Sequence, residues 1–161
     1  MSPELDVLLC QRYPKIFVDR RASIQTSCMA WGFSCGDGWF EIVDAICARL
    51  QHMTDHEGAP QVVASQVKEK FGSLKFYVRR ATEAQIDEIS RIAGRSNHIC
   101  EVCGAPGATV VAGGWHQVRC AEHTPAGALS FSEFAARRRA AQAEWERLQS
   151  PQGQRRLRGE A

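Results

Sequence analysis

Two short stretches, HICEVCG at residues 98–104 and RCAEH at residues 119–123, decide how the C-terminal half of this chain folds. Each holds two metal-ligating side chains with two residues between them: Cys100 and Cys103 in the first, Cys120 and His123 in the second. This spacing lets both side chains of a pair face one metal ion from a tight turn, and a second pair completes a tetrahedron. The sequence therefore predicts one structural zinc ion, Zn2+, bound by these four residues, which we call the Cys3His cluster.

The segment between the two pairs, residues 104–119, is long enough to run out and back as a hairpin. Gly113 and Gly114 stand in the middle of ATVVAGGWHQV, where a two-residue turn needs residues that tolerate positive φ. A hairpin that turns there would bring the two ligand pairs to the same place.

The chemistry expected at this metal is structural, because a catalytic zinc site keeps one position open and this cluster supplies four protein ligands. Zinc deaminases need His-x-Glu followed by Pro-Cys-x-x-Cys, and His98 and Glu101 do not stand in that order. HNH nucleases need further histidines between the cysteine pairs, and His116 is the only one there. An iron–sulfur centre is less suited, because one ligand is a histidine. We therefore expect that the chain is not an enzyme.

The rest of the chain shows the sequence patterns of helices and strands. The apolar periods predict a short helix over 2–13, a long helix over 35–58, a β-hairpin over about 61–80, a helix over 82–96 and a final helix over 129–149. They indicate an α+β fold: helices packed on a small antiparallel β-hairpin or sheet, then a treble-clef or zinc-ribbon module, then a last helix. The expected domains are 1–96, the zinc-binding module 97–128, the C-terminal amphipathic helix 129–150 and a disordered basic tail 151–161.

Local signals mark several element ends. Asp37 is expected to cap the long helix, and Gly58 stands where a left-handed residue would end it. The long helix should bury one face, made of Trp39, Ile42, Val43, Ile46, Leu50 and Met53.

Two later helices begin with the spacing of a capping box, Thr82 with Gln85 and Ser130 with Glu133. In the first of them Ile86, Ile89 and Ala93 are expected to form the buried face. In the last helix one face carries Phe134, Ala141, Trp145 and Leu148.

Composition limits the classes of function. The chain has 161 residues, 44% of them hydrophobic, and a net charge of +2, so no strong positive field indicates wholesale binding to nucleic acid. No window approaches the length of an apolar membrane span, and no membrane partner is expected. Seven cysteines without a secretory signal favour a reducing compartment, so the expected location is the bacterial cytoplasm.

Other cysteines and histidines form weaker patterns. Cys28 and Cys35 with His52 and His56 resemble a second metal site, but the long helix would place the two pairs about 20 Å apart. The glycines of CGDGW, residues 35–39, precede a helix as in a phosphate loop, yet the lysine of that motif is missing. We interpret this stretch as a turn. Cys35 at a helix start is a weak candidate for an activated thiol.

Two basic surfaces are candidates for contact with a partner. The hairpin interleaves basic side chains with Phe71, Phe76 and Tyr77, and the last helix carries an arginine run; the candidate residues are Lys68, Lys70, Lys75, Arg79, Arg137, Arg138 and Arg139. A macromolecular partner, most simply a bacterial protein, is expected. The alternative is a nucleic-acid-binding module, since basic and aromatic residues on a sheet can bind single strands. A solvated face explains either pattern equally simply.

The segments WGFSCGDGWFEIVDAIC, QVKEKFGSLKFYVRR and ICEVCGAPG with GGWHQVRCAEH together resemble a group of small proteins encoded by phages and prophages. The resemblance covers most of residues 10–125. It implies a bacterial cytoplasm and an accessory role, such as binding a host protein or antagonising a defence system. The zinc-binding half is also similar to treble-clef fingers, except that Pro125 and Gly127 interrupt the helix expected after the second ligand pair.

Overall fold

Helix α2 (Phe40–His56) is the central element of the N-terminal half in the computed structural model, which describes residues 1–150. The predicted apolar face is confirmed, and Trp39 just before the helix is fully buried beside it. Gly58 adopts φ 72° where the helix has ended, as expected. The core side chains that α2 itself contributes are Ile42, Val43, Ile46, Cys47, Leu50 and Met53.

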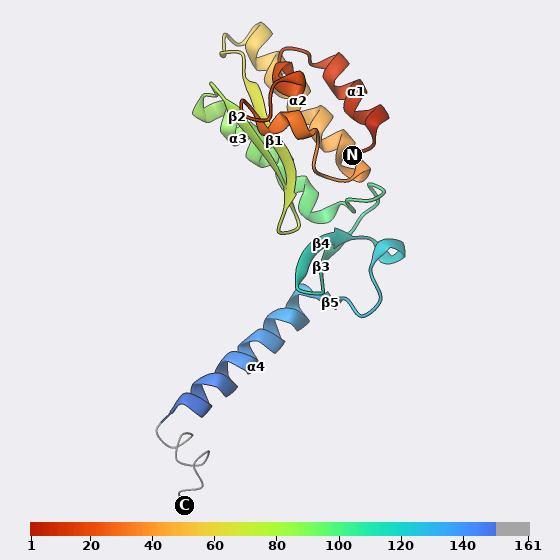
Figure 1. Cartoon of the computed structure of the whole chain (residues 1–161), viewed down its shortest axis with the longest axis vertical. Coiled ribbons are helices and arrows are strands. Elements are labelled where there is room, and N and C mark those ends of the chain that lie inside the picture. The colour runs from red at the N-terminus through yellow and green to blue at the C-terminus, as the bar shows by residue number, and fades with distance from the viewer. Residues whose placement is uncertain (151–161) are drawn as a thin grey trace, which may run out of the picture.

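Three further elements enclose this core: α1 (Pro3–Arg12), α3 (Glu83–Ala93) and a hairpin of β1 (Val63–Lys70) and β2 (Ser73–Arg79), as Figure 1 shows. The segment between α1 and α2 has no regular period and forms three short 3₁₀ helices, η1 (Val18–Arg21), η2 (Cys28–Trp31) and η3 (Asp37–Trp39). The expected α+β class is therefore confirmed.

The predicted hairpin is present, and its turn is made by Phe71 and Gly72. Both residues have positive φ, 54° and 76°, which matches the twist that two-residue hairpins need. The outer edge of β1 is occupied, because Ser34 bridges to Lys68 and the amide of Ala64 donates to the carbonyl of Ile16. Along β2 the side chains alternate: Leu74 and Phe76 are buried in the core, whereas Lys75 and Tyr77 face solvent.

Helix α3 begins with the predicted capping box of Thr82 and Gln85. The expected buried face was partly wrong: Ile86 is 49% exposed, whereas Ile89 and Ile92 are buried. The difference arises because Gln85 is itself fully buried, with its amide nitrogen donating to the carbonyl of Pro60 at 3.0 Å. Gln85, with its hydrogen-bonded side chain, thus takes the buried position that the apolar period predicts for Ile86.

The C-terminal half begins after the 3₁₀ helix η4 (Gly94–His98) and contains a second sheet. Its strands are β3 (Ala108–Ala112), β4 (Trp115–Arg119) and the short β5 (Leu129–Ser130), in the order β4-β3-β5. Gly113 and Gly114 form the predicted turn, both at positive φ. Strand β5 falls at the start of the segment expected to be purely helical, and it pairs with β3 through Val110 and Val111.

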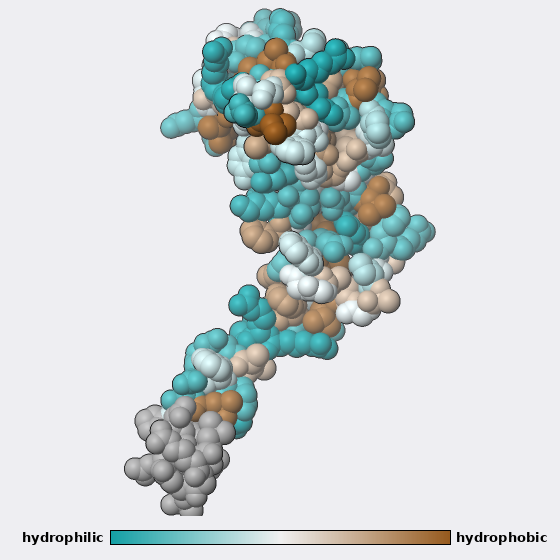
Figure 2. Space-filling model, viewed as in Figure 1, coloured by the Kyte–Doolittle hydropathy of each residue, from teal (hydrophilic) through white to brown (hydrophobic). Residues whose placement is uncertain are grey.

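Helix α4 (Phe131–Gln149) follows β5 directly and starts with the predicted capping box of Ser130 and Glu133. It extends away from the rest of the molecule (Figure 1) and buries none of its side chains among the described residues. In Figure 2 its surface is largely hydrophilic, with apolar side chains showing between the polar ones. The predicted tail, residues 151–161, lies outside the described residues. Within residues 1–150 no helix is both long and apolar enough to cross a membrane.

Candidate metal centre

The four predicted ligands come together in one place. Their ligand atoms all lie within 4.8 Å of one another. The Sγ atoms of Cys103 and Cys120 are 3.7 Å apart, and Nδ1 of His123 lies 3.8 Å from Sγ of Cys100 and 3.1 Å from Sγ of Cys120. A tetrahedron built on bonds of about 2.3 Å to sulfur has edges of about 3.8 Å. The Cys3His cluster could therefore hold one metal ion.

The first ligand pair sits on a tight turn that follows η4. The amide of Gly104 donates to the carbonyl of Cys100 at 2.9 Å, and the amide of Cys100 donates to the carbonyl of Ala105 at 2.8 Å. Gly104 has φ 77°, a conformation that a residue with a side chain seldom adopts. This backbone geometry turns the two cysteines toward the same point.

The second ligand pair stands at the end of β4, where η5 (Ala121–His123) begins. The amide of His123 donates to the carbonyl of Cys120 at 3.2 Å, and the hydroxyl of Thr124 donates to the same carbonyl at 2.8 Å. The turn ends at Thr124 rather than continuing as an α-helix. The interruption expected from Pro125 and Gly127 is thus present, and the ligand pair lies on a 3₁₀ turn instead of the first turn of a treble-clef helix.

The thiols of the cluster differ in how readily they ionise. Burial opposes ionisation of Cys100, but hydrogen bonds from the backbone of Cys120, Cys103 and Val102 outweigh it and lower the pKa of this thiol to about 6. The backbone of Ala105 favours the Cys103 thiolate, but burial and the neighbouring sulfurs outweigh that effect and raise the pKa of Cys103. A cation at the centre would stabilise every thiolate and remove this conflict.

The cluster is attached to the N-terminal half through the glycines of CGDGW. A Cβ atom on Gly38 would lie 2.2 Å from the carbonyl oxygen of Cys100 and 2.4 Å from the amide nitrogen of Gly104. A Cβ atom on Gly36 would lie 2.2 Å from the carbonyl oxygen of Glu101, and the amide of Gly38 donates to that oxygen at 2.9 Å. The turn of residues 100–105, which carries the first ligand pair, is called here the metal-binding turn. Both glycines are required because the backbone packs closely against it.

Asp37 does not cap α2, contrary to expectation. Its Oδ1 atom accepts a hydrogen bond from the amide of Ser2 at 2.6 Å, so the carboxylate holds the N-terminal segment instead. The residue at the start of α2, Trp39, donates from Nε1 to the carbonyl of Ile99 at 2.9 Å, one residue before the first ligand.

A largely buried ion pair lies where the two ligand pairs contact the N-terminal half. Arg119 Nη1 lies 2.9 Å from Glu101 Oε2, and both side chains are largely buried. The other carboxylate oxygen of Glu101 accepts from the amide of Gly36 at 3.1 Å. The two residues lie next to metal ligands in sequence, so the ion pair ties both ligand pairs to the N-terminal half.

The remaining cysteines and histidines form no second centre within residues 1–150, where the Cys3His cluster is the one group of this kind. The weak candidate role of Cys35 as an activated thiol is wrong, because burial raises its pKa to about 12. Burial, followed by the charge of Asp6, raises the pKa of Cys10 to about 11. His52 lies beside His56, with ring centroids 4.8 Å apart, and its Nδ1 contacts Glu57 at 3.1 Å.

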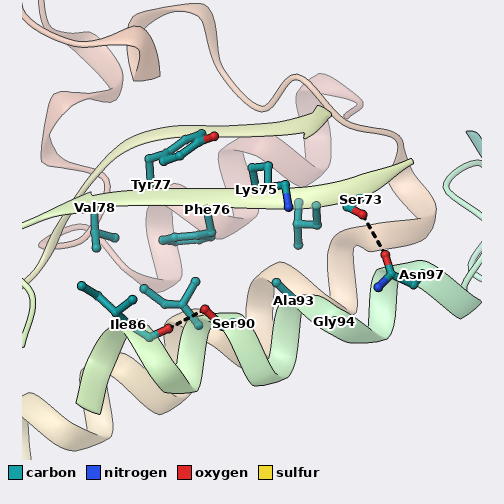
Figure 3. Close-up of a pocket in the computed structure, with 12 residues that line it drawn as sticks. Ser73, Lys75, Phe76, Tyr77, Val78, Ile86, Ser90, Ala93, Gly94 and Asn97 are labelled. Atoms are coloured by element: carbon teal, nitrogen blue, oxygen red, sulfur yellow. Dashed lines mark hydrogen bonds between the residues drawn. The ribbon is translucent and has the colours of Figure 1, made fainter. Parts of the chain in front are cut away.

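A groove of about 480 Å³ runs between β2 and α3 (Figure 3). Phe76 and Val78 point from the strand toward the helix, whereas Tyr77 points away from it, and Ser73 donates to Asn97 at 2.8 Å at one end. Among the described residues that line the groove there is no carboxylate, histidine or cysteine. The groove lining is mixed: apolar side chains from both elements stand beside the polar side chains of Ser73, Lys75, Ser90 and Asn97.

The predicted partner-binding residues fall on two separate surfaces. Lys68, Lys70, Lys75 and Arg79 lie on the outer face of the β1–β2 hairpin, where the register sets Lys68 directly opposite Lys75. Arg79 forms an ion pair with Asp19, and the ammonium group of Lys68 lies 5.9 Å from the centre of the Tyr77 ring. The other three, Arg137, Arg138 and Arg139, are on α4, which extends away from the hairpin (Figure 1).

Sequence reasoning missed the residues that join the two halves. Gly36, Gly38 and Glu101 were not recognised, because their roles depend on a contact between segments about 65 positions apart. The glycine pair before a helix was the available signal, and it was interpreted as a simple turn.

Comparisons with known proteins found no match: no family model, no curated protein and no solved structure is similar to this chain.

Proposed function

We propose that the Cys3His cluster binds one zinc ion and that this ion is structural. Four protein ligands at tetrahedral spacing leave no position for a substrate, and three thiolates with one imidazole are a donor set typical of structural zinc. The bound metal holds the metal-binding turn and η5 together, and through Gly38 and Glu101 it stabilises the junction with α2. The zinc thereby supports a folded scaffold.

The scaffold serves, we propose, to bind another macromolecule through the hairpin face, which we define as Lys68, Lys75, Tyr77 and Arg79. The observation that carries this proposal is the direct opposition of Lys68 and Lys75. Like charges directly opposite on a sheet destabilise it, and an acidic partner would relieve that repulsion.

The surface beside the hairpin face favours a protein partner. A groove of about 530 Å³ runs between the strands and residues 24–28, and its lining includes Ile24, Cys28, Lys68 and Tyr77. Ile24 is 61% exposed and Tyr77 is 43% exposed. An acidic protein surface with apolar side chains would match both the charge and the groove. The phage-like accessory role and a bacterial partner belong to the same proposal.

The test is capture of partners from a bacterial lysate by the full, zinc-loaded chain. We expect a protein that the unchanged chain retains and that the double variant Lys68→Glu/Lys75→Glu loses. Lys15→Glu is the matched control, because Lys15 is exposed and lies outside the hairpin face. A captured protein that all three chains retain equally would contradict the role of the hairpin face.

Single-stranded nucleic acid is the second candidate, because Tyr77 stands exposed between basic residues on a sheet. Binding by phosphate contacts falls steeply as salt rises. Titration of labelled single-stranded DNA and RNA at low and moderate salt separates the two candidates. Tight binding at low salt that collapses at moderate salt and in the double variant would favour nucleic acid over protein.

A further inference from the structure

Beyond its first turn, helix α4 exposes one face to solvent, on which Arg138, Ala141 and Trp145 lie. Its first turn is anchored, because the rings of Phe131 and Phe134 lie 5.8 Å and 5.5 Å from the ring of His116 on β4. Beyond that turn the helix runs into solvent, and Trp145 is 60% exposed. Most helical stability in proteins comes from packing of one helix face, so a helix that projects in this way gains stability from a packing partner.

One stripe of α4 has a spacing that reads the same in both directions, and its side chains are apolar at every position except Arg138. The positions are 131, 134, 138, 141, 145 and 148, which are separated by three, four, three, four and three residues. This alternation is the seam of a helix pair. Bulky residues stand at both ends, Phe131 and Phe134 at one and Trp145 and Leu148 at the other, while the middle holds Ala141 and Arg138.

Charge along α4 is divided between its two halves. The first half carries Arg137, Arg138 and Arg139 against Glu133, and the second half carries Glu144 and Glu146 against Arg147, so the first half is net basic and the second net acidic. The ion pair recorded along α4 within residues 1–150 is the one between Arg147 and Glu144, at 2.7 Å. A second copy of the same helix laid in the opposite direction would present its acidic half to this basic half.

We propose that α4 pairs with α4 of a second copy of this chain in antiparallel orientation about a two-fold axis. In this pairing Phe131 meets Leu148 of the other copy, Phe134 meets Trp145, and Ala141 leaves space opposite Arg138. Arg137 of each copy lies beside Glu144 of the other, which gives two symmetric ion pairs at the edge of the seam. The overlap from residue 131 to residue 148 spans about 26 Å.

The parallel orientation is unfavourable. In parallel register Arg138 would face Arg138 of the other copy at the centre of the seam, and Arg137 would lie beside Gln142 with no ion pair formed. The antiparallel orientation also suits the shape of the molecule: α4 extends away from the body (Figure 1), so the two bodies lie at opposite ends of the helix pair.

The test is sedimentation equilibrium of the full, zinc-loaded chain from low-micromolar to sub-millimolar concentration. We expect a reversible dimer with twice the chain mass of 17.9 kDa. Either Arg137→Glu or Glu144→Arg alone should weaken the dimer by about tenfold, because each places two like-charged pairs at the seam. Mixing these two variants should restore assembly as a heterodimer, because the antiparallel arrangement then has opposite charges at both edges.

Arg139→Glu is the matched control: it makes the same charge change on the outer face of the helix and should leave the dimer unchanged. Circular dichroism checks that each variant keeps its helix. A monomer at every concentration would overturn the proposal. A dimer that Arg137→Glu and Arg139→Glu weaken equally, or one that mixing fails to restore, would overturn the antiparallel pairing.

Discussion

There is no room for a side chain at position 38, because backbone atoms of the metal-binding turn lie close to the Cα atom of Gly38. A Cβ there would meet the amide nitrogen of Cys103 at 2.8 Å as well as the closer atoms of Cys100 and Gly104. All three are main-chain atoms, so they cannot rotate aside as a flexible side chain would. The contact explains why a glycine follows Asp37 so closely before α2.

Replacing Gly38 by alanine should therefore destabilise the protein by about 1–3 kcal/mol, the range typical of an overpacked contact. Chemical denaturation followed by circular dichroism measures the change. Gly94→Ala is the matched control: its Cβ would meet nothing within 4 Å, and its φ of −55° suits alanine. That variant should be neutral or slightly more stable. Equal stability of the two variants would contradict the packing described for Gly38.

Cys100 belongs to the proposed set of zinc ligands, and Cys28 does not. Cys100 is fully buried in the cluster, whereas Cys28 is exposed on η2 and outside it. Cys100→Ser should lose stoichiometric zinc, because serine is a poor zinc ligand, and Cys28→Ser should retain it. Metal analysis of both purified variants checks this. Full zinc retention by Cys100→Ser would remove this residue from the ligand set.

Helix α3 depends on a buried amide. Gln85 donates to the carbonyl of Pro60 and accepts from the amide of Thr82 at 3.0 Å, so one side chain caps the helix and fixes the preceding loop. Gln85→Leu leaves both main-chain groups without this partner. The free energy of unfolding should fall by about 1–3 kcal/mol. Gln25→Leu, at an exposed position, should change it by less than about 0.5 kcal/mol. Denaturant titration of both variants measures these changes. An equal loss of unfolding free energy in the two variants would contradict the role given to Gln85.

The elements that could be predicted from sequence are those whose causes are local. Both capping boxes, the apolar face of α2 and the turns at Phe71–Gly72 and Gly113–Gly114 depend on residues a few positions apart. The four residues of the Cys3His cluster were predictable for the same reason, since each pair follows a short spacing. These features required no knowledge of tertiary contacts.

The remaining features depend on contacts between distant segments. Ile86 was expected in the core, but Gln85 takes the buried position because Pro60 supplies an acceptor. Strand β5 forms only because β3 offers an open edge to Leu129 and Ser130. Asp37 holds Ser2 instead of capping α2. In each case a partner far along the chain overrides the local preference.

The two halves of the molecule are coupled through the metal-binding turn. Gly38, Trp39 and Gly36 all make hydrogen bonds to residues between Ile99 and Glu101. The zinc proposed at the cluster therefore stabilises the start of α2 as well as the C-terminal sheet, since metal binding in such sites contributes directly to folding.

Removal of the metal should consequently loosen more than the ligand loops. Chelation should lower the melting temperature and speed amide exchange in residues 99–123 and also in residues 36–39. Residues 85–93 of α3, which form no hydrogen bond with either ligand pair, serve as the internal control and should change less. Hydrogen–deuterium exchange with and without chelator measures this, and faster exchange confined to residues 99–123 would contradict the coupling.

The central claim is that four side chains close a tetrahedral site around one structural zinc. X-ray absorption at the zinc edge on the full chain, purified without added metal, tests it most directly. The account predicts one zinc per chain with three sulfur neighbours at about 2.3 Å, one nitrogen at about 2.0 Å and no bound water. A spectrum that requires an oxygen ligand or fewer than three sulfurs, or a purified chain that holds no zinc, would contradict it.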